Sequence, residues 1–115
     1  MNTEPGQSGQ RRVREILGQP IVFDWKDFFE DPDDWSEDIA RFLAAEAGLG
    51  ELSDEHWRVL HFLRTYYRQN GRAPLNKHLT SGLGMSIARI ESLFPGGIKY
   101  GARRLAGLPN PKSCM

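Results

Sequence analysis

The segment from Ser53 to Gly71 constrains the fold most, because it carries a broad apolar face at helical spacing. Ser53 is a favourable N-cap residue, Asp54 and Glu55 fill the first turn, and Gly71 is suited to end the helix. A face this broad must be covered by other elements, so we expect a central helix of a small bundle, ending near Asn70. The apolar residues of this face are Trp57, Val59, Leu60, Phe62, Leu63, Tyr66 and Tyr67.

A second helix is predicted upstream of the central one. Asp31, followed by Pro32-Asp33-Asp34, indicates a helix start, and the helix should continue to about Ala47, before Gly48. One apolar face recurs along it at Trp35, Ile39, Phe42 and Leu43. The clustered carboxylates could form a metal site or an acid–base pair. A solvated helix N-terminus is the simpler explanation, because it favours acidic side chains without any further function.

Residues 75–94 have the pattern of a helix-turn-helix pair. The first helix ends at Gly82–Gly84, and Ser86 is placed to cap the second, whose buried side is Ile87, Ile90 and Leu93. In DNA-binding proteins the N-terminal residues of the second helix face the major groove, and in this chain those residues would include Ser86 and Arg89. The same geometry also serves plain helix packing. A DNA-binding regulator is therefore one alternative function.

The N-terminal region predicts a tail followed by a β-hairpin. Residues 1–12 are mostly polar and lack periodicity, so we expect a disordered tail. Apolar residues on both sides of Gly18-Gln19-Pro20 indicate two strands, with Pro20 at the turn or at a strand start. Because a two-stranded hairpin is marginal alone, it should lean on the helices.

Residues 107–115 hold the only cysteine, Cys114, one position from the end. Pro109 and Pro111 favour an extended arm, which would reach roughly 20 Å from Leu108 to Cys114. Such an arm can offer a thiol to a partner, although a frayed terminus fits the same composition. One cysteine excludes an intramolecular disulfide and a cysteine-based zinc site, so we expect a reducing compartment and neither metal nor cofactor.

A formal net charge of zero hides an asymmetry along the chain. Residues 20–60 hold twelve acidic and three basic side chains, giving −9, whereas residues 61–115 hold nine basic and one acidic, giving +8. The basic half could meet tRNA, an acidic protein or the molecule's own acidic half. No apolar run approaches the ~20 residues of a membrane span, and the N-terminus lacks the apolar stretch of a secretory signal.

The C-terminal motif resembles that of the DsrC/TusE sulfur-relay family. It consists of Leu93-Phe94-Pro95-Gly96-Gly97, a short helix over about 97–106, and Ala106-Gly107-Leu108-Pro109-Asn110-Pro111 leading to Cys114. Weaker likeness extends upstream to about residue 13. The resemblance implies a mainly α domain over 13–106: a small orthogonal helical bundle with an N-terminal hairpin, a helix-turn-helix-like pair and an extended C-terminal arm. It also implies a cytoplasmic carrier that holds sulfur as a persulfide on Cys114.

Position 103 is the most informative departure from DsrC proteins that serve sulfite reductase. Those proteins have a second cysteine eleven residues before the last, and Arg103 stands there instead. The single cysteine resembles the TusE arrangement, which implies transfer from an upstream donor protein to an external acceptor that thiolates tRNA wobble uridine. The resemblance thus implies a sulfurtransferase-type carrier rather than a stand-alone enzyme. An accessory protein of dissimilatory sulfite reductase is the other family alternative.

Three cations could assist the thiol. The thiolate accepts sulfane sulfur, and neighbouring positive charge favours that form. Arg103, Arg104 and Lys112 are the candidates if the arm folds back over the last helix. We hypothesise that Arg103 stabilises the Cys114 thiolate or its persulfide, the alternative being a solvent-facing arginine. His56 and His61 are interpreted as surface or core-edge residues.

Overall fold

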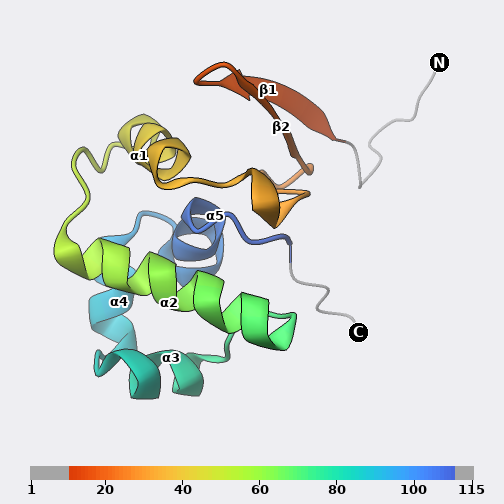
Figure 1. The fold of residues 1–115 in the computed structure, drawn as a ribbon. Helices are drawn as coiled ribbons and strands as arrows, with labels where there is room; N and C mark the ends of the chain where they lie inside the picture. Colours follow the sequence, from red (N-terminus) through yellow and green to blue (C-terminus); the bar gives the residue numbers. More distant parts are fainter. Residues whose placement is uncertain (1–10, 111–115) are drawn as a thin grey trace.

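The computed structural model describes residues 11–110. A two-stranded hairpin precedes a set of helices (Figure 1), which confirms the predicted mainly α fold. The elements are β1 (Arg12–Ile16), β2 (Gln19–Phe23), the 3₁₀ turn η1 (Pro32–Asp34), α1 (Glu37–Glu46), α2 (Asp54–Asn70), α3 (Asn76–Leu83), α4 (Ile87–Leu93), the π-helical η2 (Ile98–Ala102) and α5 (Arg103–Leu105).

The helix α2 is the centre of the bundle, as its broad apolar face predicts. It crosses the molecule in Figure 1 and contacts α3, α4 and α5. Val59, Leu60 and Leu63 are completely buried at these contacts. The predicted ends are also confirmed, because the Ser53 hydroxyl caps the first turn and Gly71 adopts the left-handed conformation after the last.

The hairpin is antiparallel and closes through Leu17 and Gly18. Pro20 pairs with Glu15 near the start of β2, where a missing backbone donor is tolerated because both strands are edges. The inner face of the hairpin forms a second small core with residues from the chain that follows. This core, which supplies the support that an isolated hairpin lacks, consists of Ile16, Ile21, Phe23, Phe29 and Ile39.

The predicted continuous helix from Asp31 to Ala47 is wrong at its start. The Asp31 carboxylate caps only the short turn η1, and the chain is extended again at Trp35. Ser36 then starts α1 by accepting a hydrogen bond from the Ile39 amide at 3.2 Å. A second cap within five residues therefore divides the helix, and Trp35 lies outside α1.

The pair α3–α4 has the predicted helix-turn-helix connection. Gly84 is left-handed at the end of α3, and the Ser86 hydroxyl caps α4 by accepting from the Arg89 amide at 3.1 Å. The Arg89 side chain forms an ion pair with Glu55 at the start of α2. Arg89, the main candidate for contacting DNA bases, is therefore already paired with a carboxylate of the same molecule.

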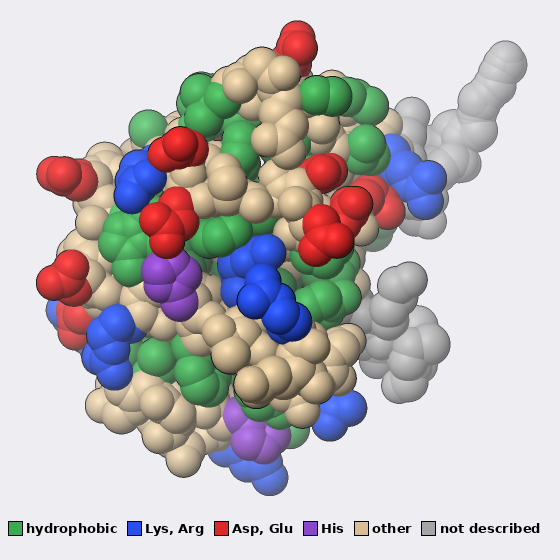
Figure 2. Space-filling view, viewed as in Figure 1, with side chains coloured by type: hydrophobic (Ala, Val, Ile, Leu, Met, Phe, Trp, Pro, Cys, Tyr) green, Lys and Arg blue, Asp and Glu red, His purple; other side chains and the backbone are tan. Residues whose placement is uncertain are grey.

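The charge asymmetry of the sequence is partly neutralised within the molecule. Figure 2 shows acidic side chains mainly over the upper part of one face and basic and histidine side chains mainly over the lower part. Within residues 11–110, the ion pair of Glu55 with Arg89 joins the acidic and basic segments, and Glu37 also contacts the ring of His61. None of the helices within residues 11–110 combines the length and apolar character that a membrane span requires.

Candidate functional site

The base of the C-terminal arm is a sharply defined turn after α5. The Gly107 amide donates to the Arg104 carbonyl at 3.0 Å, and the Leu108 amide donates to the Arg103 carbonyl at 3.1 Å. Gly107 has a φ of 76°. This double hydrogen bond around a left-handed glycine is the Schellman ending of a helix, and it fixes the direction in which the arm leaves.

Gly107 is also required by space, because it lies against the ring of Trp35. A Cβ atom at this position would lie 2.4 Å from Cδ1 of Trp35. The indole Nε1 donates to the Leu105 carbonyl at 2.8 Å. The Trp35 side chain thus covers the turn and satisfies one of the free carbonyls at the end of α5.

Arg64 on α2 satisfies the next carbonyl. Its Nη1 donates to the Ala106 carbonyl at 2.9 Å, and its Nη2 donates to the Pro32 carbonyl at 3.1 Å. The guanidinium lies 4.2 Å from the centre of the Trp35 ring. Burial lowers the pKa of Arg64. One side chain therefore ties the arm base, the central helix and the turn η1 together.

The arm remains attached to the domain as far as Asn110. The Leu108 side chain is buried, and the Asn110 amide donates to Asp24 at 3.0 Å. The other oxygen of the buried Asp24 carboxylate accepts from the Lys26 and Phe28 amides. Cys114 stands four positions after Asn110, which sets its maximum reach from that residue at about 13 Å for ~3.3 Å per residue. Leu108, from which the predicted arm is counted, therefore belongs to the core.

The first half of the C-terminal motif packs against the start of α2 and against η2. Nδ1 of His56 accepts a hydrogen bond from the Ser53 amide, so the ring proton is on Nε2. Nε2 then donates to the Leu93 carbonyl at 2.7 Å. Gly101 lies so close to Pro95 that a Cβ atom would come within 2.4 Å of its carbonyl oxygen. The leucine-phenylalanine-proline segment and the glycine-rich segment after it are therefore parts of one packed unit.

A DsrC family model, described as "DsrC like protein", matches residues 15–115. This chain belongs to the DsrC family. It is 32% identical over 108 residues to a sulfurtransferase TusE of Sodalis glossinidius, covering 88% of this chain and 99% of the relative. It is 34% identical over 83 residues to the gamma subunit of dissimilatory-type sulfite reductase of Nitratidesulfovibrio vulgaris, covering 72% of this chain and 79% of the relative.

Solved structures of DsrC proteins have the same fold. The oxidised gamma subunit of dissimilatory sulfite reductase (DsrC) from Archaeoglobus fulgidus superposes with a TM-score of 0.79 at 30% identity. The match covers 90% of this chain and all of that one. The hairpin and the helices around the arm base are thus a DsrC architecture.

Arg103 and Arg104, two of the three cations predicted to assist Cys114, point to different neighbours. Arg103 donates from Nη2 to the Pro74 carbonyl at 3.1 Å, and burial lowers its pKa. Arg104 instead places its guanidinium over the rings of Phe28 and Tyr100. Cys114 and Lys112 lie outside the described residues. Their predicted contact with either arginine therefore stays a prediction.

Sequence reasoning missed the residues that hold the arm base. Trp35, Arg64 and Asp24 contact it from 70, 42 and 86 positions away in the chain. No local pattern marks such contacts. Within residues 11–110, no three His, Cys, Asp or Glu side chains converge in a way that could hold a metal ion.

Proposed function

We propose that this DsrC-family protein is a sulfur carrier that works through Cys114. The family match extends through the C-terminal motif, and relatives similar over most of the chain are named as sulfurtransferases or as a sulfite reductase subunit. The observation that carries the proposal is the arm base. Trp35, Arg64 and Asp24 hold the chain as far as Asn110, so a short cysteine-bearing end leaves from a fixed point.

The chemistry requires two exchanges at one sulfur atom. The Cys114 thiolate attacks the outer sulfur of a donor persulfide, forming Cys114 persulfide and releasing the donor as a thiolate. An acceptor nucleophile then attacks the outer sulfur of the Cys114 persulfide. The acceptor keeps that sulfur atom, and Cys114 leaves as a thiolate. No net oxidant is consumed, because the sulfane sulfur keeps its oxidation state through both exchanges.

The single cysteine favours an external acceptor. Arg103 stands where a second cysteine would allow an internal disulfide, and Cys114 is the only cysteine of the chain. We therefore propose the TusE-like role, in which a donor protein loads the carrier and a tRNA thiolase receives the sulfur, in the cytoplasm. The sulfite reductase accessory role is the second candidate, favoured by the 34% identity to the gamma subunit.

Arg103 is proposed to support the thiolate in addition to its structural contact. Its Nη2 is held by Pro74, but its buried Nε has no hydrogen-bond partner among the described residues. The test is the pH dependence of Cys114 alkylation in the wild type and in Arg103→Ala. Stabilisation predicts a higher apparent thiol pKa in the variant, whereas identical values contradict the role.

Loading is tested by intact-protein mass spectrometry after incubation with a low-molecular-weight persulfide. The proposal predicts the added mass of one sulfur atom, removed by a reductant and absent in Cys114→Ser. A wild-type mass that does not change under conditions that load a reference carrier contradicts the proposal. Salt-dependent binding of DNA by such an unloaded protein would favour a regulator instead.

A further inference from the structure

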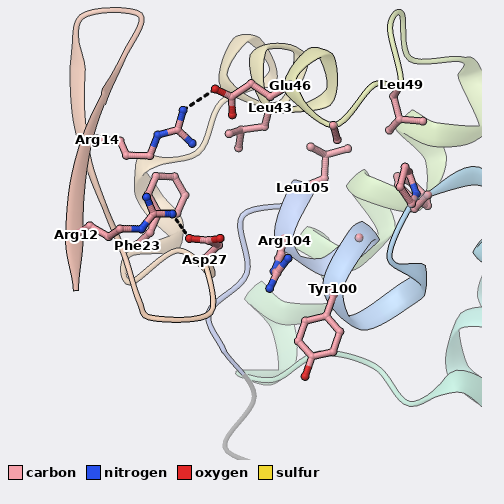
Figure 3. Close-up of a pocket in the computed structure, with 14 residues that line it drawn as sticks. Arg12, Arg14, Phe23, Asp27, Leu43, Glu46, Leu49, Tyr100, Arg104 and Leu105 are labelled. Atoms are coloured by element: carbon pink, nitrogen blue, oxygen red, sulfur yellow. Dashed lines mark hydrogen bonds and ion pairs between the residues drawn. The ribbon is translucent and has the colours of Figure 1, made fainter. Parts of the chain in front are cut away.

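A cavity of about 290 Å³ lies between the hairpin, α1 and the η2–α5 segment. In Figure 3 the side chains of Arg12 and Arg14 face it from the hairpin, whereas Arg104 and Tyr100 lie on the opposite side. Its volume is close to the lower end of the range for small-molecule sites. Much of its wall is apolar and comes from Phe23, Leu43, Leu49, Phe94 and Leu105.

Two of the three arginines at this cavity are neutralised by carboxylates that also line it. Arg12 pairs with Asp27, and Arg14 pairs with Glu46 at 2.6 Å. The Glu46 hydrogen bond raises the pKa of Arg14. These pairs lie on the hairpin side in Figure 3 and leave no net charge there.

Arg104 is the exception. Among the described residues it forms no ion pair, and its buried Nε has no hydrogen-bond partner. Its guanidinium carbon lies 4.9 Å from the centre of the Tyr100 ring and 5.3 Å from that of Phe28. A guanidinium in this position presents positive charge and free donors beside an apolar cavity.

Two ammonium groups, those of Lys26 and Lys99, add positive charge near the ring of Tyr100. Nζ of Lys99 lies 5.2 Å and Nζ of Lys26 lies 5.8 Å from the centre of Tyr100. The neighbouring ammonium groups, that of Lys26 first and that of Lys99 second, lower the pKa of the Tyr100 hydroxyl. No carboxylate pairs with either lysine within the described part of the chain. Three cations thus surround one phenol at the edge of the cavity.

We propose that this cavity binds a small organic anion. The apolar wall accepts an aromatic or branched body, and Arg104 binds a carboxylate, sulfonate or phosphate group, with Lys26 and Lys99 adding attraction at the edge. An anion there supplies the acceptor that Arg104 lacks and offsets the repulsion among the three cations. The proposal does not depend on sulfur loading at Cys114.

The test uses naphthalene-2-sulfonate, with the neutral naphthalene-2-sulfonamide as its matched control. Titration into the full-length ¹⁵N-labelled protein should shift the amides of Leu49, Gly101 and Leu105, and the sulfonate should bind at least ~10-fold more tightly than the sulfonamide. Equal affinity of the two probes, shifts confined to other residues, or no binding of the sulfonate overturns the proposal.

Variants locate the charge that is responsible. Arg104→Met keeps an apolar stem and should lose the preference for the sulfonate, whereas Arg104→Lys should keep part of it. Arg72→Met removes an exposed arginine beyond the end of α2 and should bind as the wild type does. An unchanged preference in Arg104→Met contradicts the site, provided that its amide spectrum is that of a folded protein. Cys114→Ser should bind both probes normally, so failure here is distinguishable from failure of sulfur loading.

Discussion

Gly107→Ala tests the arm base most sharply, because it changes one atom at a position with two separate constraints. The first is backbone conformation, since an L-residue at a φ of 76° costs about 1–2 kcal/mol. The second is space, because the new Cβ would lie 2.4 Å from Cδ1, 2.6 Å from Cγ and 2.7 Å from Cβ of Trp35. The indole must therefore move, or the turn must open.

The magnitude of the effect follows from adding these costs. Forcing an extra methyl into a packed contact costs about 1–3 kcal/mol, and displacing Trp35 weakens its hydrogen bond to Leu105, worth about 1 kcal/mol. Together with the backbone term, we expect Gly107→Ala to lower the unfolding free energy by about 3–6 kcal/mol, a large part of a typical total of 5–15 kcal/mol. Urea unfolding measures this difference directly.

Gly71→Ala is the matched control. Gly71 has a φ of 73° and also ends a helix, but a Cβ atom at this position would have open space around it, with nothing within 4 Å. It should therefore show the backbone cost alone, about 1–2 kcal/mol. In a Trp35→Ala background the cost of Gly107→Ala should fall without reaching that value, because the contacts with Cδ1 and Cγ are removed whereas the contact with Cβ of residue 35, at 2.7 Å, remains. Equal costs for Gly107→Ala and Gly71→Ala in the wild-type background would refute the packing argument.

Three further changes test the surrounding contacts. Arg64→Met should destabilise the protein by about 2–4 kcal/mol in urea unfolding, because two partly buried carbonyls lose a charged donor. A change below about 0.5 kcal/mol, typical of surface sites, contradicts this. Asn110→Ala should cost about 1 kcal/mol or less, and a double-mutant cycle with Asp24→Asn should show coupling if their hydrogen bond forms. The hydrogen bond from Arg89 lowers the pKa of Glu55 below its ordinary 4.5. The wild type should therefore be more stable than Glu55→Gln by its full margin above pH 4.5, and this margin should vanish as the pH falls through the lowered pKa. An advantage that persists at pH 2 excludes the ion pair as its cause.

The sequence was sufficient for features that depend on neighbouring residues. Helix caps at Ser53 and Ser86 and the left-handed stop at Gly71 are local, and each is found where the pattern predicts it. The central position of α2 also follows from its pattern, because a broad apolar face can be buried only between several partners. Local competition explains the error at Trp35, since two adjacent caps resemble a single helix start.

The arm base could not be predicted in the same way. Cys114 is identified from a motif, but the hydrogen bonds that hold the arm come from Trp35, Arg64 and Asp24, far away in the chain. Leu108 shows the consequence, because its proline-rich neighbours indicate an extended arm, whereas its own side chain is buried in the core. Arg103 and Arg104 are adjacent in sequence, yet helical geometry directs one to Pro74 and the other to Tyr100.

The measurement that tests the central claim most directly follows a labelled sulfur atom through Cys114. The protein is loaded from a persulfide carrying radioactive sulfur, freed of donor, and then given an excess of an acceptor thiol. The account predicts one labelled sulfur per chain before the chase, its complete transfer to the acceptor afterwards, and return of the protein to its reduced mass without a disulfide. Label that never enters the chain, or that enters Cys114→Ser equally well, would contradict the account.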